Sequence, residues 1–515
     1  MDLSLSGCVN LSQAFERVRA VRGPNTALAY AGGMRITYTE LGARVDRIAS
    51  GLLARGLKAR QVVAIFNHKS PDGIAAILAC NKLGLLYANI DTASPPDRCV
   101  RILDRCMPAV ILVDDAGTEA MRAISGPHAE KLVTLADVAN GAASSRVEVA
   151  GVTGSDGAYI MFTSGSTGFP KGAVITHQNV LNFIAWGKHG IGITTDDVMT
   201  NVNPIHFDNS VFDLYVALYN GATLCPFTTE QVKDARALVK LADELGCTFW
   251  FSVPSMLVYL LTMRALDRSS FTRMKRIMFG GEGFPKAKLK ELHTMLGERV
   301  KLINCYGPTE CTCICSAYDI TAADLQEMDE LAPLGHLNAD FYFHIDPLGS
   351  SDPSLGELLL GGPNVGSGYY NDPERTAKAF VQDPTEPNYR KTMYRTGDLV
   401  RLGDDGLLRF KGRVDNQIKH MGYRIELEEV EAAFSALPTV HEVGVIYKTG
   451  AAGGAGSILA YVNAHDGVTS ESLAKDITAA LPTYMRPRTI FVRHEPLPKN
   501  ANGKIDRQAL KALAQ

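Results

Sequence analysis

The sequence predicts an α/β protein with at least two domains. Segments with apolar residues at helical spacing alternate with short apolar segments in the first 150 residues, and this alternation returns around residue 250. The chain has 515 residues, more than one typical compact domain holds. After about residue 412 the pattern changes to that of a compact α+β unit, so a domain boundary is expected near Asp415.

The first part of the chain has the element order of layered α/β folds. A helix is predicted over residues 38–56, where Thr37 and Glu40 form a capping-box pattern at its start. The elements predicted next are a strand at 62–66, a helix at 72–85, a strand at 85–90, a helix at 231–246 and a strand at 247–253. Such alternation favours mostly parallel sheets. The absence of any repeat of 20–50 residues argues against a solenoid.

The C-terminal part is predicted to be smaller and mixed. It contains a helix at 425–437, strands at VGVIYK, ILAYVNA and TIFVRH, and a helix between the last two. The preceding segment GRVDNQIKHMGYR, residues 412–424, is polar and has two glycines. This composition suits a hinge.

Composition argues against several classes of function. The 52 basic and 55 acidic side chains give a net charge of -3, which offers no electrostatic footprint for nucleic acid or an anionic membrane. No apolar run approaches the roughly 20 residues that span a bilayer, and the N-terminus lacks the features of a signal peptide, so a cytoplasmic protein is expected. The ten cysteines form no CxxC pair, and no nearby histidine completes a metal set around Cys311, Cys313 and Cys315.

The segment YIMFTSGSTGFPKG, residues 159–172, predicts a phosphate-binding loop after a strand. Glycines allow close backbone approach, hydroxyls and N–H groups offer anion donors, and a lysine adds charge. The candidate residues are Thr163, Ser164, Gly165, Ser166, Thr167, Gly168 and Lys171. The spacing differs from a Walker loop because Gly172 follows the lysine. The alternative, a solvated Ser/Gly turn, does not explain a proline and lysine at this spacing.

Further motifs follow in a fixed order: ITYTELGARVDRIA, HFDNSVFDLY, NCYGPTE, GELLLGGPNVGSGYYNDPERT, YRTGDLVRL, GRVDNQIKHMGYRIELEEVE, LPTYMRP and LPKNANGKIDR. Together they resemble the adenylate-forming superfamily of acyl-CoA synthetases, luciferases and nonribosomal peptide synthetase adenylation domains, the last most closely. The resemblance implies an N-terminal domain, residues 1–414, of two layered α/β subdomains plus a distorted β-barrel. A small mobile α+β domain would follow at residues 415–515.

The resemblance also implies an ATP site. Tyr306 would stack on adenine, Thr309 would hydrogen-bond a phosphate, and Glu310 would hold Mg²⁺ on the phosphates. Asp398 and Arg413 would contact the ribose. Other matching positions are Gly281, Glu282, Asn304 and Cys305. Without the other motifs, Tyr306 is as well explained as a buried core tyrosine as it is as an adenine contact. Without them, the TGD segment would be interpreted as a turn.

Lys504, in the turn NANGKID, resembles the lysine that bridges the substrate carboxylate and the attacked phosphate. A mobile cation there would stabilise the charge that spreads over the transferring group. A solvated surface lysine is the alternative, and Lys499 is expected to be one. Asp415 is the candidate hinge about which the C-terminal domain would exchange Lys504 for the loop 419–424.

Asp208 indicates the substrate class, because the family's amino-acid-activating members pair this aspartate with the α-ammonium group. Helix capping is the alternative role. The remaining pocket positions are Asn209, Phe212, Ser252, Met278, Gly280, Cys305, Cys313 and Ile314. They carry no charge, and the bulky Phe212 and Met278 would shorten the pocket. We therefore expect a small neutral amino acid such as alanine, glycine or serine.

A thiol acceptor is expected from outside the chain, because no GGxS-type phosphopantetheine site is present. The acceptor would be a separate carrier protein or coenzyme A. Three rival functions stay open: an acyl- or aryl-CoA synthetase, a catalytically inactive nucleotide-binding module, and an aminoacyl-tRNA-type ligase. Asp208 disfavours the first. The presence of Lys504, Glu310 and the loop disfavours the second, and no basic surface or class motif supports the third.

Overall fold

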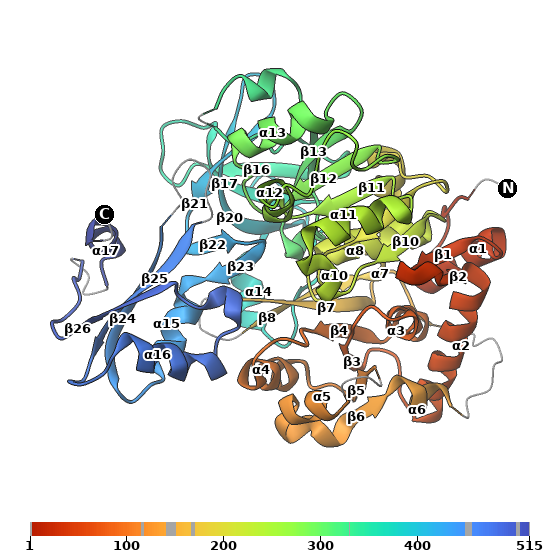
Figure 1. Cartoon of the computed structure of the whole chain (residues 1–515), viewed down its shortest axis with the longest axis horizontal. Helices are drawn as coiled ribbons and strands as arrows, with labels where there is room; N and C mark the ends of the chain where they lie inside the picture. Colours follow the sequence, from red (N-terminus) through yellow and green to blue (C-terminus); the bar gives the residue numbers. More distant parts are fainter. Residues whose placement is uncertain are drawn as a thin grey trace.

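The computed structural model describes residues 3–114, 118–140, 151–165, 170–328, 330–448, 456–500 and 505–513. A large N-terminal domain and a smaller C-terminal domain make up the fold (Figure 1). The larger domain contains two sheets with helices between them and on their outer faces. Its largest hydrophobic cluster lies between these sheets and contains residues of both.

The first sheet has seven strands and is parallel in its centre. In spatial order the strands are β18 (Gly368–Tyr369), β8 (Lys171–Thr176), β7 (Gly157–Thr163), β4 (Leu86–Ile90), β3 (Val62–Phe66), β5 (Val110–Val113) and β6 (Leu132–Thr134). Its central strands are apolar throughout and buried, as parallel strands covered on both faces are. Helices that accompany it are α2 (Tyr38–Ala54), α3 (Pro71–Leu83), α4 (Pro96–Cys106), α5 (Thr118–Ile124) and α6 (Leu135–Ala139).

The second sheet has nine strands. Their order is β15 (His336–Leu337), β14 (Ser316–Asp319), β13 (Lys301–Tyr306), β12 (Arg276–Gly280), β11 (Phe249–Ser252), β9 (Val198–Asn201), β10 (Thr223–Pro226), β1 (Thr26–Ala29) and β2 (Arg35–Thr37). One face packs on α1 (Leu11–Arg22), α7 (His177–Trp186) and the helical run 209–219. The other face packs on α10 (Thr229–Lys233), α11 (Ala235–Glu244), α12 (Pro254–Thr262) and α13 (Lys286–Leu296).

The N-terminal domain also contains a third sheet, which is antiparallel and has five strands. The family resemblance implied a distorted β-barrel in this domain. The third sheet comprises β16 (Tyr342–Asp346), β17 (Leu355–Gly361), β20 (Thr392–Leu402), β19 (Phe380–Gln382) and β21 (Leu408–Arg413), with α14 (Pro373–Ala379) beside it. Both β19 and β21 pair with β20. Among the described strands, no pairing closes this sheet into a ring.

The C-terminal domain begins with a hairpin of β22 (Gln417–His420) and β23 (Tyr423–Glu426), followed by α15 (Leu427–Ser435). A three-stranded sheet of β24 (Val440–Lys448), β25 (Ser457–Ala464) and β26 (Thr489–Arg493) follows, with α16 (Ser470–Asp476) and α17 (Arg507–Leu513). In Figure 1 the hairpin points into the N-terminal domain, whereas α17 lies at the far side of the small domain.

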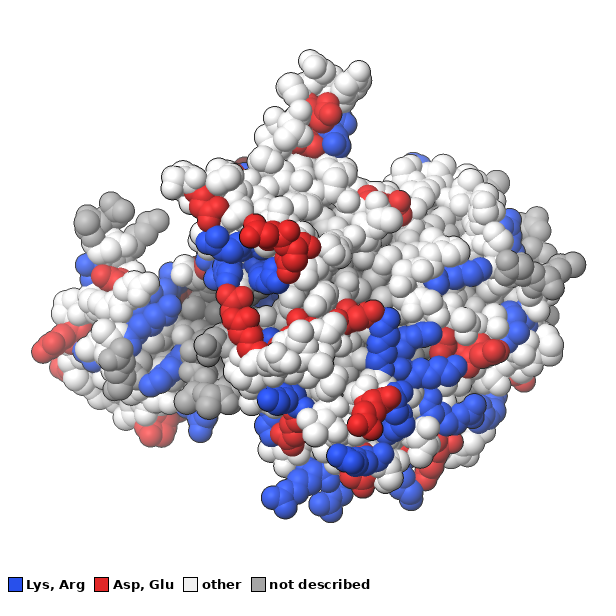
Figure 2. All heavy atoms as spheres, turned by 90° about the horizontal axis from the view of Figure 1, so that it is seen from above, with Lys and Arg blue, Asp and Glu red and all other residues white. Residues whose placement is uncertain are grey.

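The surface and the cysteines match the expectations from composition. On the face seen in Figure 2, basic and acidic side chains lie side by side. All ten cysteines are free thiols; nine are buried, and Cys8 is half-buried. None of the helices in the described part of the chain has the length and apolar character that crossing a bilayer requires.

Candidate active site

The Ser/Gly-rich loop connects two paired strands. β7 and β8 are antiparallel neighbours, and their register sets Thr163 opposite Lys171, so the two ends of the loop lie side by side. The predicted residues Ser166, Thr167 and Gly168 lie outside the described residues. Ser164 is buried, and its hydroxyl donates to the carbonyl of Arg424 at 2.6 Å.

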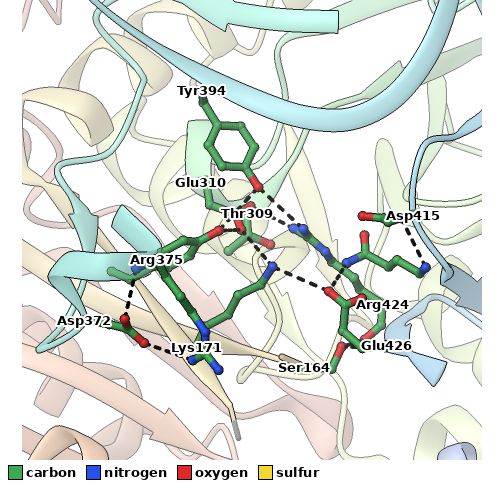
Figure 3. Close-up of polar contacts among 12 residues, drawn as sticks. Ser164, Lys171, Thr309, Glu310, Asp372, Arg375, Tyr394, Asp415, Arg424 and Glu426 are labelled. Atoms are coloured by element: carbon green, nitrogen blue, oxygen red, sulfur yellow. Dashed lines mark hydrogen bonds and ion pairs between the residues drawn. The ribbon is translucent and has the colours of Figure 1, made fainter. Parts of the chain in front are cut away.

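Lys171 lies between two buried carboxylates, as Figure 3 shows. Its Nζ is 3.8 Å from Oε1 of Glu310 and 3.6 Å from Oε1 of Glu426. Burial lowers the pKa of Lys171 below its ordinary value. Both ion pairs are longer than the 2.7–2.9 Å typical of a direct charge-assisted hydrogen bond. The ammonium group is therefore held by charge without close contact to either partner.

Glu310 is fully buried at the start of the short 3₁₀ turn Thr309–Cys311. Its Oε1 accepts from the hydroxyl of Tyr369 at 2.7 Å, and its Oε2 accepts from Arg424 at 2.8 Å. Burial acts to raise the pKa of this carboxyl, but Arg424 and Lys171 outweigh it and hold the pKa at about 2. Glu310 is thus a stable anion that already has a cationic partner.

Three residues predicted to contact adenosine lie together. The register of β20 and β21 sets Asp398 opposite Arg413. Asp398 accepts from the hydroxyl of Tyr306 at 2.7 Å and also from Arg413. Arg413 in turn binds both carboxylate oxygens of Asp415, at 2.6 and 2.7 Å. The predicted hinge residue is therefore joined to the predicted ribose site by one arginine.

Asp208 is the residue just before the helical run 209–219, but its side chain does not cap that helix within the described part of the chain. Its Oδ2 instead accepts from the hydroxyl of Thr309 at 2.5 Å. Burial raises the pKa of Asp208. The run contains a π-helical stretch, Phe212–Val216, and such insertions are frequent at functional sites. The carboxylate faces Thr309, which directly precedes Glu310 in the chain.

The predicted pocket residues divide into two groups. Phe212, Met278, Cys305, Cys313 and Ile314 belong to the cluster between the two large sheets and are at most 5% exposed. The remaining three positions are Asn209, Gly280 and Ser252.

Asn209 lies near the pocket thiols, with 3.9 Å between its Oδ1 and Sγ of Cys313. A Cβ added to Gly280 would lie 2.4 Å from Sγ of Cys305, so this thiol fills the space beside the glycine. The hydroxyl of Ser252 accepts from Nε1 of Trp250 at 2.8 Å and donates to the carbonyl of Val253 at 3.1 Å. Its hydrogen bonds are therefore made to a residue of its own strand and to the residue that follows the strand.

The other predicted nucleotide contacts have structural partners. Glu282 follows Gly281, which has a left-handed φ of 94°. Its carboxylate accepts from the N–H groups of Ser255 and Gly422, both at 2.8 Å. Asn304 donates to the carbonyl of Pro333 at 2.8 Å. Glu282 consequently joins the N-terminal domain to the hairpin of the C-terminal domain.

Lys419, Arg424 and Glu426 also belong to the site; the motifs predicted that the loop 419–424 enters it but identified none of these three residues individually. Lys419 lies over the ring of Tyr306, with 5.6 Å between its Nζ and the ring centroid, and burial lowers the pKa of this lysine. Lys419 and Arg424 are opposite each other in the hairpin. The sequence pattern that could have identified two of them is the alternation of charged with aromatic or apolar residues in YRIE. This alternation puts Arg424 and Glu426 on one face of a strand.

Lys504 lies outside the described residues. Nearby, Lys499 pairs with Glu442 at 2.7 Å, and Ile505 packs against the C-terminal sheet. Within the described residues, no group of three or more His, Cys, Asp or Glu side chains is placed to hold a metal ion. Any divalent cation at Glu310 would therefore need most of its ligands from elsewhere.

The fold and the site together define a two-domain α/β protein in which the start of a Ser/Gly-rich loop contacts a hairpin of the second domain. The chain belongs to the AMP-binding enzyme family. The profile of the AMP-binding enzyme matches residues 15–370, and the profile of the AMP-binding enzyme C-terminal domain matches residues 429–504.

Named relatives cover nearly the whole chain. It is 31% identical to D-alanine–D-alanyl carrier protein ligase of Lacticaseibacillus casei, over 97% of this chain and 98% of that protein. It is 32% identical to malpinin synthetase of Mortierella alpina and 33% identical to surfactin synthase subunit 2 of Bacillus subtilis. The chain spans only 6% and 14% of the lengths of these two relatives.

Solved structures share the fold. The adenylation domain AlmE of Vibrio cholerae, in complex with glycyl-adenosine-5'-phosphate, superposes with a TM-score of 0.83 at 21% identity, covering 100% of this chain and 99% of that one. The nonribosomal peptide synthetase protein PA1221, which contains adenylation and carrier domains, gives 0.83 at 24% identity, covering 99% and 85%.

Proposed function

We propose that this chain is an AMP-forming ligase that activates a small neutral α-amino acid and passes it to the phosphopantetheine thiol of a separate carrier protein. The observation that carries this proposal is the position of Asp208. Its half-buried carboxylate has no ion pair within the described residues, and it lies one hydrogen bond from Thr309. A carboxylate withdrawn from water is costly without a cation, so an ammonium group on the substrate would stabilise it.

The nucleotide would extend from Tyr306 and Asp398 to the loop at Lys171. Asp398 would accept the ribose hydroxyls, Tyr306 would offer its ring to adenine, and the loop with Lys171 would take the phosphates. The amino-acid carboxylate would then attack the α-phosphorus. An acyl–phosphate bond forms, and the bond to pyrophosphate breaks. We assign Lys504 to this step as the cation that stabilises the charge on the transferring group.

Glu310 is the proposed Mg²⁺ ligand, and its surroundings fit that role under one condition. Magnesium commonly binds one or two carboxylates together with substrate phosphates and water, so a single carboxylate suffices when ATP is present. One of its oxygens is bound by Arg424 in this structure. The site therefore fits the ion once Arg424 has moved away. When bound, the ion would neutralise charge on the phosphates.

The second half-reaction would use the same site with a different set of residues. The thiol attacks the carbonyl of the aminoacyl-AMP, a thioester forms, and AMP leaves. The arrangement described above, with Lys419 beside Tyr306, supports the prediction that the hairpin replaces Lys504 for this step. We propose residues 1–414 and 415–515 as the two moving units, with Asp415 as the hinge.

The names of the relatives support the substrate class. One relative is a ligase that acts on D-alanine and a carrier protein, and one solved neighbour holds a glycyl adenylate. Phe212 and Met278 are fully buried beside the proposed pocket, which favours a short side chain. An acyl- or aryl-CoA synthetase is the second candidate, because the same nucleotide residues would serve it.

A pyrophosphate-exchange screen tests the proposed function. We expect glycine, serine or one enantiomer of alanine to support exchange at least about tenfold faster than the matched acids without an amino group, since these acids cannot form the ion pair with Asp208. Equal rates with acetate and propionate would favour the CoA synthetase. No exchange with any carboxylic acid, despite measurable ATP binding, would favour an inactive nucleotide-binding module.

A further inference from the structure

A buried acid and a buried base border the helical run that carries part of the proposed amino-acid pocket, and the proposed reaction uses neither. Asp213 is fully buried in the π-helical stretch Phe212–Val216, directly after the pocket residue Phe212. Lys69 is 8% exposed and lies between β3 and α3. Titratable side chains are rarely enclosed in a protein interior unless specific partners hold them. The partners of these two residues therefore indicate what the residues do.

Asp213 connects the helical run 209–219 to two strands of the nine-stranded sheet. Its Oδ2 accepts from Nδ2 of Asn201 and from Nδ2 of Asn203, both at 2.9 Å. Asn201 is the last residue of β9. Nδ2 of Asn203 also donates to the carbonyl of Phe251 in β11, at 3.0 Å. One carboxylate oxygen thus joins the run to the ends of both strands.

Lys69 binds the same end of the sheet. Its Nζ donates to the carbonyl of Asn201 at 2.8 Å and to the carbonyl of Phe227, which directly follows β10, at 3.0 Å. Asn201 therefore binds Lys69 through its carbonyl and Asp213 through its amide. Burial raises the pKa of Asp213 and lowers the pKa of Lys69, and each group opposes the shift of the other. The two side chains are thus coupled by charge and by a shared neighbour.

The backbone of Lys69 has a conformation that side-chain-bearing residues rarely adopt. Its φ is 64°, in the left-handed region. The N–H of Lys69 donates to Oδ1 of Asn67 at 2.8 Å, and its carbonyl accepts from the hydroxyl of Tyr30 at 2.9 Å. Backbone strain of this kind persists where the surroundings enforce it, and it is concentrated at functional sites. Here the enforced conformation accompanies a lysine side chain that reaches the ends of β9 and β10.

We propose that Lys69 and Asp213 are positioning residues for the amino-acid pocket. Together they hold the helical run 209–219 on the strand ends and fix its π-helical register. The register in turn determines where the run places Asp208 and Phe212. Both residues act through the run and not by contact with the substrate. This inference rests on the proposed function, which assigns the run to an amino-acid site.

Pyrophosphate exchange at varied substrate concentration separates positioning from a contribution to stability. Lower stability reduces the amount of folded enzyme and therefore every rate, but it leaves KM and the ratio of kcat/KM between two amino acids unchanged. We expect Asp213→Asn to raise KM for the preferred amino acid at least about fivefold, because small displacements of binding groups have large effects. KM for ATP should stay within about twofold of that of the unaltered protein. The kcat/KM of valine relative to the preferred amino acid should rise, since Phe212 is held less firmly.

A second substitution tests whether the two residues act as a unit. Lys69→Met leaves the Asp213 carboxylate without its buried partner and should also raise KM for the amino acid. The double variant Lys69→Met/Asp213→Asn should raise KM no more than the more affected single variant, because coupled residues are not additive. Where Asp213→Asn yields no folded protein, Lys69→Met gives the same measurement.

Asp46→Asn is the matched control. Asp46 is also buried and pairs with Lys82 at 2.6 Å, but this pair joins α2 to α3, neither of which carries a predicted pocket residue. Its KM values should equal those of the unaltered protein. An unchanged KM for the amino acid in Asp213→Asn and Lys69→Met, additive effects in the double variant, or an equal rise in the control would overturn the positioning role and leave the proposed function standing. Exchange by the unaltered protein with acids that lack an amino group, and not with amino acids, would overturn the proposed function itself.

Discussion

Asp208 and Glu310 are carboxylates of one site, half-buried and fully buried respectively, and their neighbours differ. Glu310 has Arg424 and Lys171 beside it, and its pKa is about 2. Asp208 has the neutral hydroxyl of Thr309, and burial raises its pKa. The motifs predicted both residue types and their closeness. They could not predict this contrast, because Arg424 comes from another domain, more than one hundred positions away in the chain.

The raised pKa of Asp208 predicts how amino-acid binding depends on pH. A carboxyl with a raised pKa becomes protonated as pH falls through that value, which lies above the ordinary 3.8, and a neutral acid cannot pair with an ammonium group. We expect kcat/KM for the amino acid to fall toward acid pH. Asp208→Asn should lower kcat/KM roughly 10- to 100-fold at neutral pH, the scale of one charged hydrogen bond, and remove the acid limb.

Pyrophosphate exchange at subsaturating amino acid, measured across the pH range, tests this dependence. The same assay at subsaturating ATP is the control, because the substitution should change ATP binding less. If kcat/KM of Asp208→Asn still falls toward acid pH as it does in the unaltered protein, a group other than Asp208 causes the decrease.

At the scale of elements, local signals predicted most of the fold. The helix expected at 38–56 is α2, and its capping box of Thr37 and Glu40 is present. The helix expected at 231–246 is instead two, because the side chain of Asp234 accepts from the N–H groups of Arg236 and Ala237 and starts α11 anew. Such side-chain bonds compete with a continuous helix. The spacing of apolar residues alone does not reveal this competition.

The capping box of α2 leads to a prediction for stability. In Thr37→Ala the N–H of Glu40 loses its hydroxyl acceptor, and the Thr37 side-chain contact with Glu40 is lost. The free energy of unfolding should fall by about 1 kcal/mol, measured by guanidinium titration. Thr39→Ala, an exposed position in the same helical turn, is the control and should change stability by less than about 0.5 kcal/mol. An equal decrease in the free energy of unfolding in the two variants would show that the capping hydrogen bonds do not stabilise the protein.

At the scale of the whole molecule, the two-domain division was predictable from composition, but the arrangement of the domains was not. That arrangement depends on contacts that no local pattern specifies, such as Arg98 with Glu429 and Glu282 with Gly422. The segment 412–424 was predicted to contain the hinge and a loop, 419–424, that enters the site; in this structure Lys419 lies over Tyr306 and Arg424 binds Glu310. Asp415 remains the predicted hinge.

The exchange of two lysines between half-reactions predicts separable kinetic effects. Lys504→Ala should slow adenylate formation roughly 100-fold, the scale for losing a transition-state charge donor, while ATP still binds. Thiol transfer from a preformed aminoacyl-AMP should be unaffected, because Lys419 occupies the site at that stage. Single-turnover measurements of each step separate the two. Lys499→Ala, whose lysine pairs with Glu442, is the control. Equal slowing of both steps would contradict the exchange.

The burial of the cysteines has a practical consequence. Nine thiols are enclosed, and burial raises the pKa of Cys305, Cys313 and Cys315 in and beside the pocket, so few of them carry the reactive thiolate at neutral pH. Cys8 alone reaches the surface in part, near the start of the chain. The folded protein thus has a natural single attachment point for a fluorophore, from which movement of the C-terminal domain can be followed with one introduced cysteine.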